Sequence, residues 1–311
     1  MKLHGLHHVT AITARAGDNH DFYTRTLGLR LVKKTVNQDD VSAYHLFYAD
    51  AAGTPGTDLT FFDWPAAPER RGTRSVTRTG LRVGSIATLE WWRDRLGLPD
   101  SVTERNGRPV LDFEDPEGQR LSFVVDAEPA AAVWDRSSVP AGHQIRGLGP
   151  LLLSVPTFEP TDRVFREILH LENTGTYPMD GHNVHVYRTG PSAGAARELH
   201  LRVDPDTPAA RQGAGGVHHL ALRTTQADYH AWARHLAGSG MPNSGPVDRY
   251  WFRSLYFREP NGLLIEIATD EPGFTADEPL EALGSALSLP PFLEPCRSHI
   301  ESGLVALPAS G

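Results

Sequence analysis

The chain contains one short string twice, and each copy carries two adjacent histidines. One copy is Leu6-His7-His8-Val9-Thr10-Ala11 and the other is Val217-His218-His219-Leu220-Ala221-Leu222. Histidine pairs are unusual on apolar strands because a buried imidazole needs a partner for each ring nitrogen, and a metal ion is one such partner. The repeat therefore indicates a duplicated unit with side chains that can bind a metal.

A glutamate inside an apolar strand pattern is the second chemical signal. Glu266 lies between Ile265 and Ile267. Burying a carboxylate is costly unless a positive group compensates it, and a divalent cation does so directly. The corresponding positions of the other repeated units, described below, hold Thr60, Ser122 and His200. Only one unit therefore has a carboxylate at this position.

Side chains alternate between the two faces of a strand, so His8 is expected on the face of Leu6 and Thr10, and His219 on the face of Ala221. We predict His8, His219 and Glu266 to be metal ligands. Two imidazoles and one carboxylate that leave open positions are the ligand set of non-haem Fe(II) oxygenases, and zinc with a bound water fits the same donors. The alternative is three hydrogen-bonded polar residues in the core.

The residues beside these ligands have two interpretations each. His7 and His218 face away from the ligands if the strands are regular, so a twist or β-bulge is needed for them to orient a ligand or contact substrate. Otherwise each is a core histidine with internal partners. Thr10 is either a hydrogen-bond donor near the metal or a residue that only fills the strand.

The rest of the chain repeats one pattern four times. Segments 22–29 and 91–98 both show an aromatic pair followed, at identical spacing, by Leu-Gly-Leu, and weaker copies cover 164–171 and 232–238. Segments 115–118 and 259–262 carry Pro and Gly as a tight hairpin turn requires, and each precedes an apolar strand. We predict an α+β fold in which four βαβββ modules form two half-barrel, cup-like domains, followed by a C-terminal tail.

This pattern divides the chain into four parts. The predicted parts are two modules in 1–126, of which the first supplies one ligand, a linker at 127–146, two modules in 147–270, of which the fourth supplies two ligands, and a tail at 271–311. The tail is either a lid over the pocket or an arm packed on the surface.

Composition narrows the class of protein. The formal net charge of −8 over 311 residues disfavours binding to a phosphate backbone, so we expect small-molecule partners and no nucleic acid. The single cysteine, Cys296, excludes an internal disulfide and fits a reducing compartment. Neither a signal peptide nor an apolar run of membrane-spanning length is visible, so we expect a cytoplasmic protein with no membrane partner. The oligomeric state stays open, a homo-oligomer included.

These motifs together resemble the vicinal oxygen chelate superfamily, which contains glyoxalase I, bleomycin-resistance proteins and extradiol dioxygenases. Within it the chain is most similar to hydroquinone-type ring-cleaving dioxygenases, through the first histidine string, through the segments 44–50 and 53–57, and through Leu289-Pro290-Pro291. Catechol-type enzymes take their ligands from the third and fourth units. Here the third unit has no histidine at the ligand position, so the site must join the first and fourth units.

The resemblance implies Fe(II) or another divalent metal such as Mn(II), with an aromatic diol, most simply a hydroquinone, and O₂ as substrates. It also implies that Arg249 and Tyr256 face the metal, where the phenol acts as an acid and the arginine holds an anionic oxygen. Without the resemblance, Tyr256 belongs to an aromatic core patch with its neighbours.

Two alternative functions stay open. A glyoxalase-type isomerase or thiol transferase in this superfamily commonly uses a fourth protein ligand, and Thr60 at that position disfavours it. A binding protein of the bleomycin-resistance kind needs neither Glu266 nor the paired histidines and shows no metal-dependent turnover.

Overall fold

The computed structural model describes residues 1–99, 101–130, 132–190 and 194–308, and it contains the four successive βαβββ units that the sequence predicts. The first unit consists of β1 (Leu6–Thr13), α1 (Ala16–Asp21), β2 (Arg30–Asn37), β3 (Asp40–Ala49) and β4 (Asp58–Asp63). The second consists of β5 (Ser75–Val83), α2 (Ile86–Leu96), β6 (Thr103–Arg105), β7 (Arg108–Glu114) and β8 (Arg120–Val125). The third consists of β9 (Leu148–Val155), α3 (Phe158–Arg163), β10 (Glu172–Met179), β11 (His182–Arg188) and β12 (Glu198–Val203). The fourth consists of β13 (Val217–Thr224), α4 (Gln226–Gly238), β14 (Val247–Asp248), β15 (Arg253–Arg258) and β16 (Leu264–Thr269).

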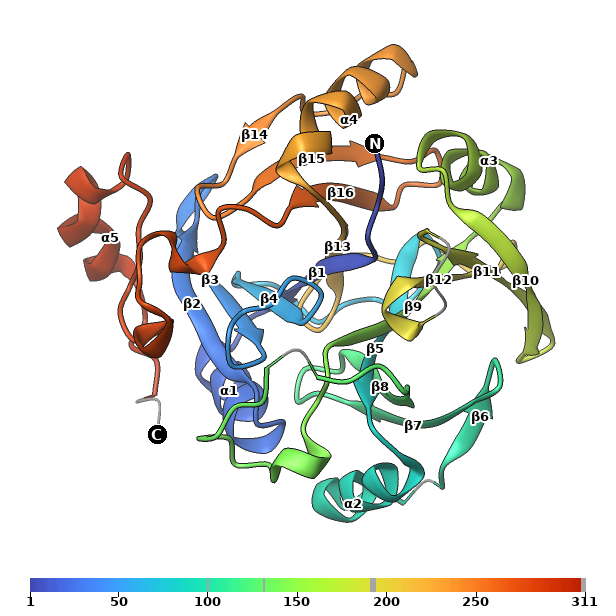
Figure 1. Ribbon diagram of the computed structural model, residues 1–311, viewed down its shortest axis with the longest axis horizontal. Helices are drawn as coiled ribbons and strands as arrows, with labels where there is room; N and C mark the ends of the chain where they lie inside the picture. The colour runs from blue at the N-terminus through green and yellow to red at the C-terminus, as the bar shows by residue number, and fades with distance from the viewer. Residues whose placement is uncertain (100, 131, 191–193, 309–311) are drawn as a thin grey trace.

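The strands form two eight-stranded sheets, in the orders β14-β15-β16-β13-β1-β4-β3-β2 and β10-β11-β12-β9-β5-β8-β7-β6 (Figure 1). We call them the 1/4 sheet and the 2/3 sheet after the units that they join. Antiparallel pairing of β1 with β13, and of β5 with β9, makes each junction. Each sheet therefore joins one unit that precedes the predicted linker to one unit that follows it. The domain boundaries themselves stay a prediction.

Figure 1 shows the four unit helices at the periphery of the molecule, and two of them begin at a side-chain cap. Ser85 Oγ caps α2 by accepting from Thr88 N at 3.2 Å, and Thr225 Oγ1 caps α4 in the same way. The helices α1 and α3 instead continue into π-helical turns at Phe22–Thr26 and Val164–Ile168.

The largest hydrophobic cluster contains residues of all four units, among them Val9, Leu81, Leu151 and Leu220. Trp92 of α2 and Trp232 of α4 are fully buried in it, so both are packing residues. Because the helices cover the apolar face of each sheet, the other face can carry polar side chains.

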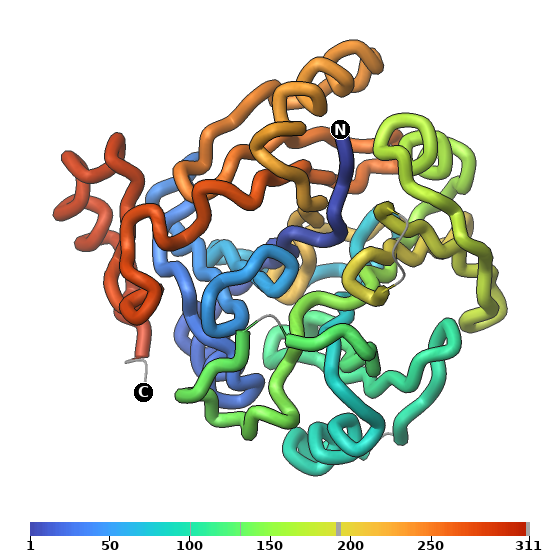
Figure 2. Tube along the Cα trace, viewed as in Figure 1, coloured from blue at the N-terminus to red at the C-terminus, as the bar shows by residue number. Residues whose placement is uncertain are grey.

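The tail consists of short helical turns and one helix packed beside the first unit. The elements are turns at Phe274–Ala276, Leu280–Ala282 and Glu294–Cys296 and the helix α5 (Arg297–Gly303). Ser288 N donates to the carbonyl oxygen of Lys34 on β2 at 2.9 Å. Lys33, which is fully buried, forms ion pairs with Asp277 at 2.8 Å and with Glu278. The tube view shows this segment running along the outside of the first unit (Figure 2).

In its described residues the linker carries one short helical turn, at Ala141–His143. Among the described residues, no helix is long and apolar enough to span a bilayer.

Candidate metal centre

Three adjacent strands of the 1/4 sheet, β16, β13 and β1, bring Glu266, His219 and His8 together. Glu266 Oε2 lies 3.1 Å from His8 Nε2 and 2.9 Å from His219 Nε2, and the two nitrogens are 3.3 Å apart. All three side chains are buried. Within the described parts of the chain, this is the one group of three or more His, Cys, Asp or Glu residues with ligand atoms close enough to hold a metal.

The cluster has the chemistry of a cation site. Glu266 Oε2 is buried and accepts no well-formed hydrogen bond from the described residues, although two ring nitrogens approach it. Its other oxygen, Oε1, accepts from Ser254 Oγ. Burial raises the pKa of Glu266, but the adjacent imidazoles of His8 and His219 outweigh burial and hold that pKa well below its usual range. Two imidazoles and a carboxylate with converging ligand atoms fit a divalent cation.

His7 and His218 reach the ligands through β-bulges. The β1–β13 register shifts at His7 and again at His218, so each is the extra residue of a bulge. Each then lies with its Nδ1 2.8 Å from the Nδ1 of the following histidine. Regular alternation is therefore wrong here, and Leu6, expected on the ligand face, packs in the main hydrophobic cluster instead.

The bulge at His7 also determines the tautomer of His8. His7 Nε2 lies 3.1 Å from the carbonyl oxygen of Thr269, which only accepts, so the proton of neutral His7 is on Nε2. His7 Nδ1 then accepts from His8 Nδ1, and the lone pair of His8 Nε2 points into the cluster. Burial lowers the pKa of His7 to about 3, and that of His218 also to about 3, which keeps both rings neutral.

A chain of hydroxyl groups starts beside His219. Thr10 Oγ1 lies 3.0 Å from His219 Nε2 and 2.8 Å from Thr60 Oγ1 on β4, and Thr60 Oγ1 lies 3.0 Å from His45 Nε2 on β3. Thr10 therefore lies on the ligand side, as expected. The sequence analysis missed His45 and Ser254. Both stand on the third strand of their unit at matching register, which could have indicated them once the units were aligned.

Arg249 and Tyr256 lie together at the β15 side of the cluster. Tyr256 pairs with Glu266 across β15 and β16, and its hydroxyl accepts from Arg249 Nε at 3.3 Å. The Arg249 guanidinium also binds both oxygens of Asp39, at 2.8 and 3.2 Å. Burial and the nearby Glu266 raise the pKa of Tyr256 well above its usual value, so the phenol is protonated and can donate.

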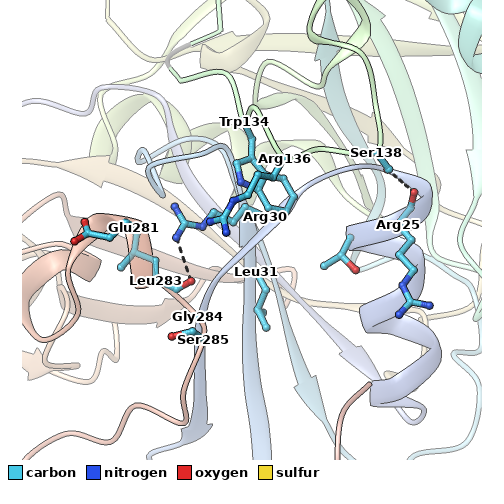
Figure 3. A pocket seen from close by; sticks show the side chains of 11 residues that line it. Arg25, Arg30, Leu31, Trp134, Arg136, Ser138, Glu281, Leu283, Gly284 and Ser285 are labelled. Carbon is cyan, nitrogen blue, oxygen red and sulfur yellow. Dashed lines mark hydrogen bonds between the residues drawn. The ribbon is translucent and has the colours of Figure 1, made fainter. Parts of the chain in front are cut away.

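A small cavity of about 30 Å³ borders the cluster. It is lined by His8, Asn37, Gln38, His45, Phe47, Phe62, His219, Arg249, Trp251, Phe252 and Tyr256. No tail residue lines it among those described, although Phe274 and Leu283 of the tail pack behind Phe47 and Trp251. A larger cavity of about 390 Å³ lies elsewhere, between the first unit, the linker and the tail, and contains none of the ligand candidates (Figure 3).

The 2/3 sheet has no comparable cluster among its described residues. His200, at the position that corresponds to Glu266, bonds to Tyr177 Oη at 2.9 Å and to Glu198 Oε2 at 3.0 Å. His143, His182, His185, His230, His235 and His299 are likewise not part of the cluster.

Comparison with known proteins places this geometry in a family. Residues 147–267 match the model of the glyoxalase/bleomycin resistance protein/dioxygenase superfamily. A Bacillus subtilis protein named as a ring-cleaving dioxygenase, MhqA, is 45% identical, and the alignment covers 98% of this chain and 99% of that protein. The chlorohydroquinone/hydroquinone 1,2-dioxygenase of Sphingobium indicum is 32% identical over 96% of this chain and 95% of that protein.

Solved structures agree. The crystal structure of a Bacillus subtilis protein described as a dioxygenase superposes with a TM-score of 0.91 at 36% identity, over 99% of both chains. Glyoxalase I from Zea mays shares the fold alone, with a TM-score of 0.61 at 11% identity, over 86% of this chain and 92% of that one. The chain therefore belongs to the glyoxalase/bleomycin resistance protein/dioxygenase superfamily, in which these two full-length relatives are named as dioxygenases.

Proposed function

We propose that the protein is a non-haem Fe(II) dioxygenase that uses O₂ to open the ring of a hydroquinone or substituted hydroquinone. The observation that carries this proposal is the cluster of His8, His219 and Glu266, whose three ligand atoms converge on one buried point. This donor set leaves coordination positions for two further ligands, as ring cleavage by O₂ requires. The name of the Sphingobium indicum relative supports hydroquinone as the substrate class.

The absence of a second carboxylate supports this function over a glyoxalase-type isomerase. Thr60 stands on β4 at the register of Glu266 on β16, and its hydroxyl bonds to Thr10 and His45. An isomerase of this superfamily commonly has a fourth protein ligand there. A threonine hydroxyl is a weak ligand for a divalent cation, so the first unit contributes one ligand only.

Each group around the cluster then has a role. His8, His219 and Glu266 would hold the metal, and His7 and His218 would orient the two ligand rings through their Nδ1 atoms. When bound, Fe(II) supplies the redox chemistry that lets O₂ react with an ionised diol ring. Mn(II) fits the same donors. Thr10 can hydrogen-bond an oxygen of whatever occupies the space beside His219 Nε2.

Arg249 and Tyr256 supply positive charge and a proton at one wall of the cavity. Arg249 can hold an anionic oxygen of the substrate, and Tyr256, protonated and bonded to Arg249, can donate its hydroxyl proton as the ring opens. Neither group carries a donor strong enough to retain a metal, so both act on rate.

The size of the cavity adds a requirement. A space of about 30 Å³ holds a water molecule or O₂, whereas an aromatic ring needs several times that volume. Ring binding therefore requires side chains of the wall to rotate. The aromatic side chains of Phe62, Trp251 and Phe252 line this space and are the candidates for that rotation.

Oxygen consumption tests the proposal. The protein is loaded with Fe(II) without oxygen and then mixed with O₂ and a hydroquinone, a chlorinated hydroquinone, catechol or a hemithioacetal. We expect O₂ uptake and a ring-opened product with a hydroquinone, and none with zinc in place of iron. If no diol gives O₂ uptake, the proposed function is wrong. Isomerisation of the hemithioacetal supports the glyoxalase alternative instead. We further propose the cytoplasm as its location, in keeping with a single, exposed Cys296.

A further inference from the structure

A line of hydrogen bonds leaves the metal cluster on the side away from Tyr256 and ends at His45. The strand order places β15, with Tyr256, on one side of the ligand strands, and β4 and β3, with Thr60 and His45, on the other. The links are Thr10 Oγ1 to Thr60 Oγ1 at 2.8 Å and Thr60 Oγ1 to His45 Nε2 at 3.0 Å. The function described so far does not use His45.

His45 is held in place and faces the cavity. Its ring packs against Phe47 and Phe62, with centroid distances of 4.0 and 4.4 Å, and it lines the same cavity as His8 and Tyr256. Among the described residues, the bond from Nε2 to Thr60 is the one hydrogen bond of this ring. Its second nitrogen, Nδ1, therefore has no protein partner in the described chain and can exchange a proton with water in the cavity.

Internal repetition shows that this arrangement is special to the first unit. His45 on β3 pairs with Phe62, as Ser254 on β15 pairs with Ala268, so the two residues occupy equivalent positions. In the fourth unit this position supports a carboxylate, since Ser254 Oγ donates to Glu266. In the first unit the equivalent pair is a hydroxyl and an imidazole, which is a set of groups that moves protons.

Resting on the proposed function, we propose that Thr10, Thr60 and His45 form a proton path that takes the hydroxyl proton of the diol from the metal cluster to the imidazole of His45. Each hydroxyl both donates and accepts, so the transfer balances at every atom. The diol loses its proton to Thr10 Oγ1, Thr10 passes its own proton to Thr60 Oγ1, and Thr60 passes its own to His45 Nε2. The imidazolium then releases its Nδ1 proton to water in the cavity.

The electrostatics of His45 keep its ring neutral at rest, so that Nε2 has a lone pair for the incoming proton. Burial is the main cause that holds the pKa of His45 well below its usual value, and the neighbouring His8, His219 and Arg249 lower it further. The ring is therefore neutral before the transfer and does not retain a proton afterwards.

The test compares variants that interrupt the path at its middle. Thr60→Val removes the hydroxyl and leaves Thr10 and His45 in place, whereas Thr60→Ser keeps a hydroxyl. His45→Phe removes the acceptor and keeps the aromatic packing. Tyr44→Phe is the matched control, because Tyr44 is the preceding residue on β3 and packs in the hydrophobic cluster on the other face. Measurements are bound iron, anaerobic affinity for a hydroquinone, and kcat for hydroquinones of increasing acidity.

We expect T60V and H45F to keep their iron and bind the diol within about threefold of the parent, and to lose about a hundredfold in kcat. The loss should shrink for more acidic, chlorinated hydroquinones, which need less help to ionise, and T60S and Y44F should resemble the parent. A kcat within about threefold of the parent for T60V, an equal loss for all hydroquinones, or a loss of iron overturns the proton path. If the parent protein itself does not cleave any hydroquinone, the proposed function is wrong, and the proton path is wrong with it. The parent alone gives that result, whereas the variants test the path in an active enzyme.

Discussion

The two sheets of this protein share one architecture, but their equivalent interior positions hold different polar side chains. In the 1/4 sheet Ala221 pairs with Glu266, and the candidate ligand His219 stands two residues earlier. In the 2/3 sheet Gly80 pairs with Ser122, and Arg78 stands two residues earlier. A guanidinium group therefore occupies in one sheet the position that a candidate metal ligand occupies in the other.

The polar groups of the 2/3 sheet neutralise one another. Arg78 lies 3.4 Å from Asp112, Arg105 lies 2.7 Å from the same carboxylate, and Arg108 binds both oxygens of Glu198 at 2.7 and 2.8 Å. The 1/4 sheet instead converges two imidazoles and a carboxylate with no side-chain cation among them. One copy of the duplicated sheet thus carries internal ion pairs, whereas the other leaves a carboxylate beside two imidazoles, a set that a divalent cation fits.

The largest effect should come from removing the charge of the 1/4 cluster. Glu266→Gln keeps the shape of the side chain and its bond with Ser254, but it removes the anionic ligand. Because a weak amide oxygen replaces a carboxylate, we expect no bound iron at concentrations that saturate the parent, and no ring cleavage. Elemental analysis after gel filtration measures this. Ser122→Ala, at the equivalent position of the 2/3 sheet, is the control, and full iron in E266Q contradicts the ligand assignment.

The next effect separates rate from metal binding. Tyr256→Phe removes one hydroxyl from the wall that Arg249 shares. We expect full iron and a fall in kcat of about a hundredfold, because a transition-state donor is lost while the ligands stay. Parallel measurement of iron content and product formation checks it. If the variant cleaves hydroquinone at the parent rate, Tyr256 is a packing residue and the acid lies elsewhere.

A smaller effect should follow from the bulged histidines. His7→Phe keeps the ring volume but leaves His8 Nδ1 without its acceptor. Losing such a partner typically weakens metal binding by about 10- to 100-fold. Competition with a chelator gives the affinity, and His143→Phe, a histidine outside the cluster, is the comparison. An unchanged affinity in H7F shows that the bulge does not control the tautomer.

A substitution in the 2/3 sheet should lower the stability of the fold and leave the iron content unchanged. Burial raises the pKa of Glu198, but hydrogen bonds from His200 and Arg108 outweigh it and lower the pKa to about 2. A carboxylate with a depressed folded-state pKa stabilises the fold above its unfolded pKa of about 4.5 and loses that contribution as the pH falls toward 2.

Glu198→Gln should therefore cost about 3 kcal/mol at neutral pH, because it leaves Arg108 without its carboxylate. It should also remove part of the acid dependence of stability between the two pKa values, with iron content unchanged. Denaturant unfolding at several pH values measures both. Equal acid sensitivity in parent and variant contradicts the role of this ion pair.

The smallest expected effect tests whether a carboxylate alone is enough to create a metal site in the 2/3 sheet. Ser122→Glu places a carboxylate in the 2/3 sheet at the register of Glu266. We expect no second iron, since Arg78 stands where a ligand is needed and would pair with the new charge. Two equivalents of iron per chain in S122E would contradict this expectation and show that the 2/3 sheet can also bind a metal.

The sequence was sufficient to single out the three candidate ligands and the repeated units. Repetition identifies both histidine strings without knowledge of the fold, and a lone carboxylate between two isoleucines is costly in any structure, so His8, His219 and Glu266 stand out from their residue types alone. The turns at 115–118 and 259–262 likewise depend on local geometry, and both precede the strands expected.

Only the tertiary structure decided which groups surround the ligands. The bulges at His7 and His218 arise where β1 and β13 pair across two hundred residues of chain, and strand alternation cannot reveal an extra residue that the partner strand imposes. A similar register shift occurs at Thr77 where β5 pairs with β9, so the bulge belongs to the sheet junction and not to the histidines. The contacts among Thr10, Thr60 and His45 join three strands, and they depend on a register that no single segment of sequence contains.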